Sequence, residues 1–168
     1  MDVVLDPTPI CSNMTNREFR DVFVSSRATA VTLTHNRIKS LARWDYSEQA
    51  RAKKWFGSSS EEVRAAMTVG LPKLLDVVRN LKPENVIRWD QQRQRNITCT
   101  VCTSPEAQLW KGNKVFTLIH ECTHFTDVFD STDDMYGISV GLSLWAQTNP
   151  GKAIKNADSI TCYVGFED

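Results

Sequence analysis

The stretch Lys114-Val-Phe-Thr-Leu-Ile-His-Glu-Cys-Thr-His-Phe-Thr126 decides how the rest of the chain is interpreted. Its apolar residues recur at helical spacing, at Phe116, Ile119 and Cys122. This spacing predicts a helix whose apolar face is turned towards a core. The opposite side of the same helix is then free to present its polar residues to a binding site.

Those polar residues form the pattern H-E-x-x-H, from His120 to His124. Because residues four apart share one helix face, both imidazoles can reach a single ion, which we expect to be zinc. Glu121 lies on the adjacent surface, where it can activate the attacking water instead of binding the metal. The pattern also occurs by chance, but here it uses all but one of the histidines. The other, His35, lies among polar neighbours and is expected to be a surface residue.

A third metal ligand has to come from another part of the chain. The acidic segment Asp127-Val-Phe-Asp-Ser-Thr-Asp-Asp134 follows the motif directly. Most surface acidic segments are merely solvated, but a short loop can return one of these carboxylates to the ion. The residues by themselves leave open which carboxylate that is.

The rest of the chain predicts an α+β fold, mainly helical with a small antiparallel sheet. We expect an extended N-terminal arm over residues 1–15 and a single domain over residues 16–168. Thr15 or Asn16 can cap the first helix, and Pro72 should kink or divide the third near Gly70. The expected helices are Asn16–Leu41, Ser47–Trp55, Ser60–Val78, Met135–Gln147 and Pro150–Ala157, and the expected strands are Val86–Trp89 and Asn96–Val101.

Composition narrows the classes of function. The chain has 168 residues, with 20 Lys plus Arg and 20 Asp plus Glu, so its formal net charge is zero. A generic nucleic-acid binder would carry a basic excess, so we expect no nucleic-acid partner. No apolar run is long enough to cross a bilayer, and the N-terminus lacks the features of a secretory signal. We therefore expect either a cytosolic protein, a chain whose signal was removed, or export by a dedicated secretion system.

A second pattern follows the motif. Asp133-Asp-Met-Tyr136-Gly137 begins nine residues after His124. This arrangement resembles the aspzincins, the deuterolysin and peptidyl-lysine metalloendopeptidase group, in which the helix is followed by Gly-Thr-x-Asp-x-x-Tyr-Gly. The resemblance implies a zincin-like metalloprotease domain in which Asp133 is the third zinc ligand. It also implies that Tyr136 donates a hydrogen bond to the oxyanion of the tetrahedral intermediate.

The resemblance extends to Trp55-Phe-Gly57 and to the segment Asn149–Asp158, which is similar to the family's Asp-Pro-x-Lys-Ala-x-x-Asn-Ala-Asp ending. In lysine-specific members the last aspartate, here Asp158, helps to line the pocket for the residue after the cut. A Glu three positions later assists it, whereas this chain has Thr161. The family's Gly-Thr is replaced by Asp130-Ser131. With one acid instead of two, we expect a weaker preference for Lys.

The sequence thus predicts a zinc-dependent endopeptidase with one catalytic ion, acting on a protein or peptide substrate. Two alternatives stay open: a zinc amidase acting on cell-wall peptide, and a catalytically inactive, metal-bearing binding module. The Met start without a signal, together with free thiols, also suggests a secreted effector or toxin. Such a protein would have an inhibitor or immunity protein as a partner.

Overall fold

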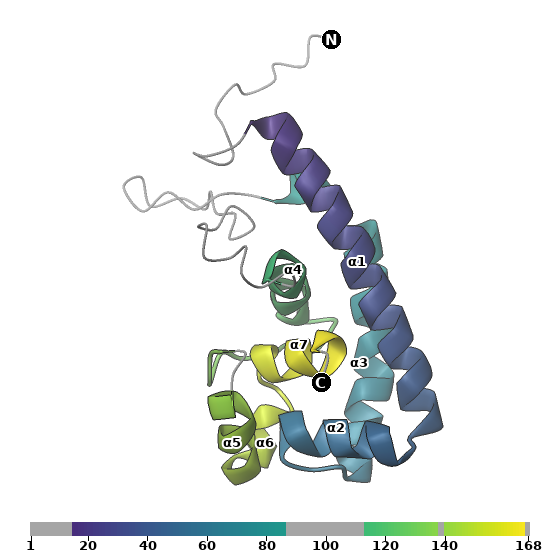
Figure 1. Cartoon of the computed structure of the whole chain (residues 1–168), viewed down its shortest axis with the longest axis vertical. Coiled ribbons are helices and arrows are strands. Elements are labelled where there is room, and N and C mark those ends of the chain that lie inside the picture. Colours follow the sequence, from purple (N-terminus) through teal and green to yellow (C-terminus); the bar gives the residue numbers. More distant parts are fainter. Residues whose placement is uncertain (1–14, 87–112, 138–139, 167–168) are drawn as a thin grey trace.

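The computed structural model describes residues 15–86, 113–137 and 140–166. In Figure 1 the long helices α1 and α3 run side by side, with α4 and α7 packed beside them and α2 across one end. The helices are α1 (Asn16–Arg43), α2 (Tyr46–Phe56), α3 (Glu61–Asn80), α4 (Asn113–Thr123), α5 (Val140–Thr148), α6 (Pro150–Ala153) and α7 (Ala157–Gly165), with a 3-10 turn η1 at Pro83–Asn85.

Local capping chemistry explains where the first helices begin. Thr15 caps α1 through a capping box, because its hydroxyl accepts from the Glu18 N–H while the Glu18 carboxylate accepts from the Thr15 N–H. Ser60 caps α3 by accepting from the Val63 N–H. Of the kink or division expected at Pro72, the division is not formed: α3 continues through this residue, whose ring lies on the exposed side of the helix.

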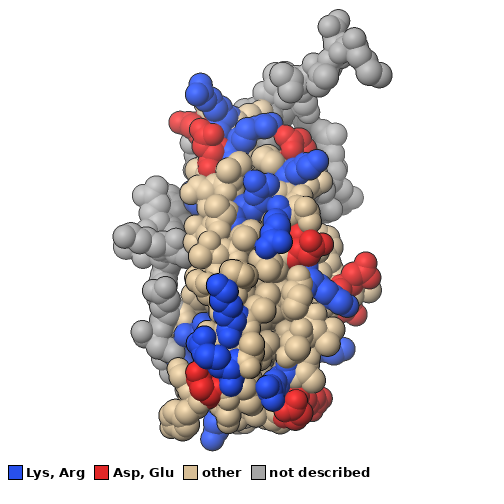
Figure 2. Space-filling model, turned by 90° about the vertical axis from the view of Figure 1, so that its right-hand side faces the viewer, with Lys and Arg blue, Asp and Glu red and all other residues tan. Residues whose placement is uncertain are grey.

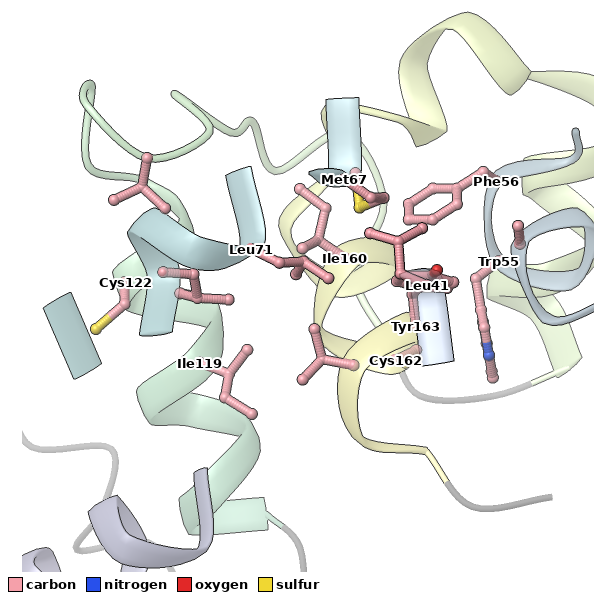
Figure 3. Packing of buried hydrophobic residues seen from close by; sticks show 14 of the residues in the cluster. Leu41, Trp55, Phe56, Met67, Leu71, Ile119, Cys122, Ile160, Cys162 and Tyr163 are labelled. Carbon is pink, nitrogen blue, oxygen red and sulfur yellow. The ribbon is translucent and has the colours of Figure 1, made fainter. Parts of the chain in front are cut away.

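Helix α4 packs into the core through the apolar face that its sequence predicts. Ile119 and Cys122 are buried in one cluster with Leu71 of α3 and Ile160 of α7. Figure 3 shows these four side chains in the packed interior between the helices. Phe116 is only half-buried and packs at the edge of this cluster. Because α4 is fixed between α3 and α7, its polar side has a defined position.

The prediction of a small antiparallel sheet is wrong. Over residues 15–86, 113–137 and 140–166 the structure is helical and contains no strand, only an isolated parallel bridge between Thr132 and Asn156. The strand predicted at Asn96–Val101 lies outside the described residues, as does all of Val86–Trp89 except Val86, which ends η1. Strand propensity depends on packing context, and in the described core the buried apolar residues come mostly from helices.

The C-terminal helices also differ from the prediction. One short helix was expected to run from Pro150 to Ala157, but α6 ends at Ala153 and α7 begins at Ala157. The intervening backbone pairs with Thr132 instead: Lys155 C=O accepts from the Thr132 N–H at 2.8 Å, and the Ala157 N–H donates to Thr132 C=O at 2.9 Å. This pairing takes backbone groups that a continuous helix would need.

The helix expected from Met135 starts later, at Val140. Met135 and Gly137 stay in a loop because their N–H groups donate to side chains near the start of α7. We call residues 131–137, which follow the turn after α4, the metal loop, because they contain Asp133, the metal ligand expected from the sequence.

The surface of the α1 side carries both signs of charge. The segment from Arg17 to Lys54, in which Lys and Arg outnumber Asp and Glu, forms most of α1 and α2. Figure 2 shows Lys and Arg side chains with Asp and Glu between them. Arg20 pairs with Glu84 at 2.7 Å on this surface. Among the described helices, none combines the length and apolar character that crossing a membrane requires.

Candidate metal centre

A reversal of the chain after α4 brings the acidic segment back to the histidines. Two backbone bonds close this turn: the Val128 and Asp130 N–H groups both donate to Phe125 C=O, at 2.8 and 3.2 Å. Asp130 has φ +49°, a left-handed conformation that Asp tolerates better than most residues. It occupies the position of the glycine in the Gly-Thr-x-Asp pattern, and glycine is the residue that adopts a positive φ most readily.

Three ligand atoms converge at the end of this turn. Nε2 of His120 and Nε2 of His124 lie 3.2 Å apart. Oδ1 of Asp133 is 3.3 Å from the first nitrogen and 3.4 Å from the second. Zinc bonds to nitrogen and oxygen are roughly 2.0–2.2 Å, so the edges of a regular tetrahedron around zinc are about 3.3–3.6 Å. The three atoms therefore have the separation that one tetrahedral zinc ion requires.

The hydrogen bonds of the two Nδ1 atoms determine the tautomers of His120 and His124, and with them the lone pairs on Nε2. Nδ1 of His120 lies 2.6 Å from Oδ1 of Asp158, and Nδ1 of His124 lies 2.9 Å from Ser131 C=O. Because carboxylate and carbonyl oxygens only accept, both Nδ1 atoms carry the hydrogen. In the neutral rings each Nε2 then presents a lone pair towards the Asp133 carboxylate. Three acceptors facing one point are suited to a cation.

Ser131 and Thr123 form a further connection beneath His124. The Ser131 hydroxyl lies 3.1 Å from Nδ1 of His124 and 2.7 Å from the Thr123 hydroxyl. Thr123 is fully buried and donates to His120 C=O at 2.6 Å. This chain of hydrogen bonds ties the start of the metal loop to α4 and fixes the orientation of the His124 ring.

The adjacent aspartate, Asp134, is engaged elsewhere. One of its oxygens accepts from the Thr132 hydroxyl at 2.7 Å, and the other lies 3.7 Å from the Lys152 ammonium. Of the four carboxylates in the acidic segment, the structure brings Asp133 into the cluster with both histidines. The sequence left open which carboxylate of the acidic segment reaches the histidines, and the structure favours Asp133.

Both carboxylate oxygens of Asp158 contact other groups of the protein. Oδ1 contacts His120, and Oδ2 accepts from the Gly137 N–H at 2.6 Å. Its side chain is only 14% exposed. This geometry makes Asp158 an orienting partner of a candidate ligand, and its predicted role in binding substrate stays a prediction.

Electrostatics around His120 follow from these contacts. Burial by itself lowers the pKa of this imidazole, but the hydrogen bond and the charge of Asp158 raise it. The charges of Glu121 and Asp133 raise it further, so the pKa of His120 lies above its ordinary value of 6.5. The site is therefore negative enough to stabilise a positive charge at the position of the imidazole, whether carried by a proton or by a metal.

Glu121 and Tyr136 lie on the solvent side of the cluster, and both are exposed. The Tyr136 ring stacks on the His120 imidazole, with 6.4 Å between the ring centroids and an interplanar angle of 20°. Its phenol hydrogen-bonds to Asp133, which raises the pKa of Tyr136 and keeps the hydroxyl protonated. A protonated phenol next to the three ligand atoms is a hydrogen-bond donor that a bound substrate can meet.

The structure also adds residues that the sequence did not single out for the site. Thr123 and Ser131 support His124, and Asn156 binds the metal loop. Asn156 belongs to the Asn-Ala-Asp ending already noted, so the resemblance marked its position without indicating what it contacts. Thr161, at the position of the second pocket acid, is buried and donates to Ala157 C=O.

Comparison with known proteins agrees with this geometry. The family described as "Lysine-specific metallo-endopeptidase" (Aspzincin_M35) matches residues 41–165. A curated relative, the peptidyl-Lys metalloendopeptidase of Armillaria mellea, is 54% identical over 43 residues. That match covers 26% of this chain and 12% of the length of the relative. The comparison with solved structures gave no match.

Proposed function

Since this chain belongs to the aspzincin family of metallo-endopeptidases, we propose that it is a zinc-dependent endopeptidase whose metal is held by His120, His124 and Asp133. The observation that carries the proposal is the convergence of Nε2 of His120, Nε2 of His124 and Oδ1 of Asp133 within 3.2–3.4 Å of one another. Two nitrogens and one carboxylate oxygen match the ligand set of catalytic zinc sites, which keep the fourth position for water or substrate.

Bound zinc supplies a Lewis acid that polarises the scissile carbonyl and lowers the pKa of a coordinated water to about 7. Glu121 is next to His120 on α4 and exposed to solvent, and no ion pair among the described residues neutralises its carboxylate. The carboxylate accepts the proton of the attacking water. It then transfers this proton to the leaving amine nitrogen.

Tyr136 stabilises the charge that develops on the carbonyl oxygen. Its stacking on His120 holds the ring next to the ligands, and its contact with Asp133 keeps the phenol protonated. When a substrate is bound, the hydroxyl donates to the oxyanion. Because the oxygen is more negative in the transition state than in the substrate, this hydrogen bond lowers the barrier instead of only improving binding.

A preference for Lys after the cut is the finer part of the proposal. The family description and the name of the relative both refer to lysine. Asp158 contributes negative charge beside the cluster, but its oxygens are already engaged, and Thr161 offers no second acid. We therefore propose a modest preference for a basic residue, visible as enrichment of Lys in the position after the cut but not as exclusive cleavage there.

The decisive test combines zinc content with cleavage of unfolded casein. The native protein and Glu121→Gln should both bind one zinc, while Glu121→Gln loses cleavage by roughly 100- to 10,000-fold. Glu62→Gln, which removes an exposed acid from the first turn of α3, serves as the matched control and should cleave like the native protein. Mass spectrometry of the casein fragments measures the residue after each cut. Full activity of Glu121→Gln, or a native protein that binds no zinc, would reject the proposal.

A role as an effector or toxin with a protective partner stays a prediction from the sequence. Inertness of zinc-loaded native protein on casein together with release of amines from cell-wall peptide would favour the amidase alternative. Binding of zinc without cleavage of either material would favour the binding module.

A further inference from the structure

Asn156 is a fully buried amide that contacts the backbone of a single residue in the metal loop. The Met135 N–H donates to Oδ1 of Asn156 at 3.0 Å, and Nδ2 of Asn156 donates to Met135 C=O at 3.0 Å. One side chain thus satisfies both backbone groups of one residue, as a neighbouring strand would. A third bond, from Nδ2 to the Ser159 hydroxyl at 3.2 Å, holds the amide in this orientation.

Met135 lies between the candidate metal ligand Asp133 and Tyr136, so a contact with its backbone affects the positions of both. It lies two residues after Asp133 and directly before Tyr136. On the other side of Asp133, Thr132 is paired with the backbone of Lys155 and Ala157. The segment before Asp133 and the segment after it are therefore both attached to residues 155–158, at the start of α7.

The apolar packing of this arrangement comes from Met135, which lies against the main hydrophobic core. Thr132, Asp133 and Tyr136 are exposed, and Met135 is only half-buried. A loop with so little buried surface gains its fixed shape mainly from hydrogen bonds, and a bond made in a buried site is protected from competing water. The bonds of Asn156 meet this condition, because no part of the residue is exposed.

We propose that Asn156 is a positioning residue that sets the geometry of Asp133 and Tyr136 through the Met135 backbone. The inference rests on the proposed zinc site, but Asn156 touches neither the ligand atoms nor the phenol. Its loss lets the Met135 peptide rotate, so that the Asp133 oxygen leaves its place 3.3 Å from His120 and the Tyr136 ring leaves its stack.

Asn156→Asp is the sharpest variant, since it keeps the shape and removes the donor. A carboxylate oxygen then faces Met135 C=O, and the two acceptors repel each other. We expect zinc affinity to fall about tenfold or more, as for other partners that support metal ligands. For cleavage, we expect kcat to fall with little change in KM, because Tyr136 acts on the transition state.

Asn149→Asp is the matched control. Asn149 also directly precedes a helix, and its Nδ2 donates to Trp145 C=O at 3.0 Å, outside the metal loop. This variant loses a comparable backbone bond and should keep the zinc affinity of the native protein. A general loss of stability would affect both variants, whereas a positioning effect changes the zinc affinity of Asn156→Asp alone.

The experiment measures the zinc Kd of the full chain by competition with a chromogenic chelator. Absence of zinc binding by the native protein would reject the zinc site itself, and native-like Kd in Asn156→Asp would overturn the role of Asn156. Amide hydrogen exchange of the metal-free native protein tests the contact even if the variant does not fold. Slow exchange of the Met135 N–H supports the inference, and exchange at the rate of an unprotected peptide contradicts it.

Discussion

The Asp158 carboxylate and the His120 imidazole are 38 positions apart in the sequence but lie 2.6 Å from each other. The contact joins α7 to α4 directly behind the candidate metal position. It sets the tautomer of His120, because the hydrogen on Nδ1 leaves the Nε2 lone pair free for a cation. The second oxygen of Asp158 binds Gly137, so this carboxylate connects one ligand helix with the end of the metal loop.

Replacing Asp158 by Asn should weaken zinc binding. The amide can still contact His120, but it removes the negative charge that makes the imidazole a stronger ligand. We expect a zinc Kd about 10- to 100-fold higher, measured by chelator competition. Asp127→Asn removes an exposed acid in the turn after α4 and should leave the Kd unchanged. Equal effects of both variants would show that only the total charge of the region matters.

The pKa of His120 gives the metal-free protein a defined pH dependence. Because the folded-state pKa is raised above 6.5, protonation of His120 stabilises the folded state. This contribution is fully present below about pH 6.5 and is lost as the pH rises through the folded-state pKa. Urea unfolding of metal-free protein at several pH values measures it, and Asp158→Asn should reduce the change. A native profile that rises across this range would contradict the expected sign.

Zinc affinity should show the opposite trend over the same pH range. The metal needs the unprotonated Nε2 of His120, so a proton and zinc compete for this atom. Zinc binding therefore weakens as the pH falls below the raised pKa of His120. Zinc titrations at matched ionic strength measure this competition. An affinity that stays constant as the pH falls would show that His120 is not a ligand.

The three residues that the structure brings together at the candidate metal centre were easier to find in the sequence than the architecture around them. Histidines four apart must share a helix face, and the spacing from Asp133 to Tyr136 was specific enough to identify a family. Contacts such as Asp158 with His120 depend on how α7 packs against α4, which no local pattern encodes. The end of α6 was missed for the same reason, since the pairing of Thr132 with Lys155 and Ala157 interrupts a segment that is locally compatible with a helix.

Gly70 should be intolerant of a side chain because of the turn after α4. A Cβ at this position of α3 would lie 2.0 Å from the Phe129 ring. Gly70→Ala gains about 1 kcal/mol of helix propensity but loses roughly 1–3 kcal/mol through overpacking. We expect net destabilisation in urea, together with weaker zinc binding as Phe129 displaces the turn.

Two further variants separate packing from other effects of this change. Gly151→Ala, where a Cβ meets no atom within 4 Å, should be neutral or stabilising. Adding Phe129→Ala to Gly70→Ala should cost less than the sum of the two single changes, because the clash is then absent. Strict additivity in this double-mutant cycle would show that Gly70 acts independently of Phe129.

Asp130 should accept glycine without loss of stability. Its φ of +49° is unfavourable for a residue with a side chain, although Asp tolerates it. Asp130→Gly removes this strain but makes the unfolded chain more flexible, so we expect a change within about 1 kcal/mol. Asp127→Gly lies in the same turn at a residue without positive φ and should destabilise by roughly 0.5–1 kcal/mol. Thermal unfolding compares the two, and equal losses would contradict the assigned strain.

Two ion pairs of equal length should differ in their effect on stability because their burial differs. Arg37 and Glu48 approach to 2.7 Å with side chains 15% and 4% exposed, while Arg20 and Glu84 approach to 2.7 Å with side chains 60% and 59% exposed. The buried carboxylate also accepts from the Tyr163 hydroxyl, so it links α1, α2 and α7.

Glu48→Gln leaves Arg37 with an uncompensated charge, which we expect to lower the free energy of unfolding by about 3–5 kcal/mol. Glu84→Gln should change it by less than about 1 kcal/mol, because water replaces the lost partner. Urea unfolding of both variants measures the difference, and similar losses would show that burial does not determine the contribution of the Arg37–Glu48 pair.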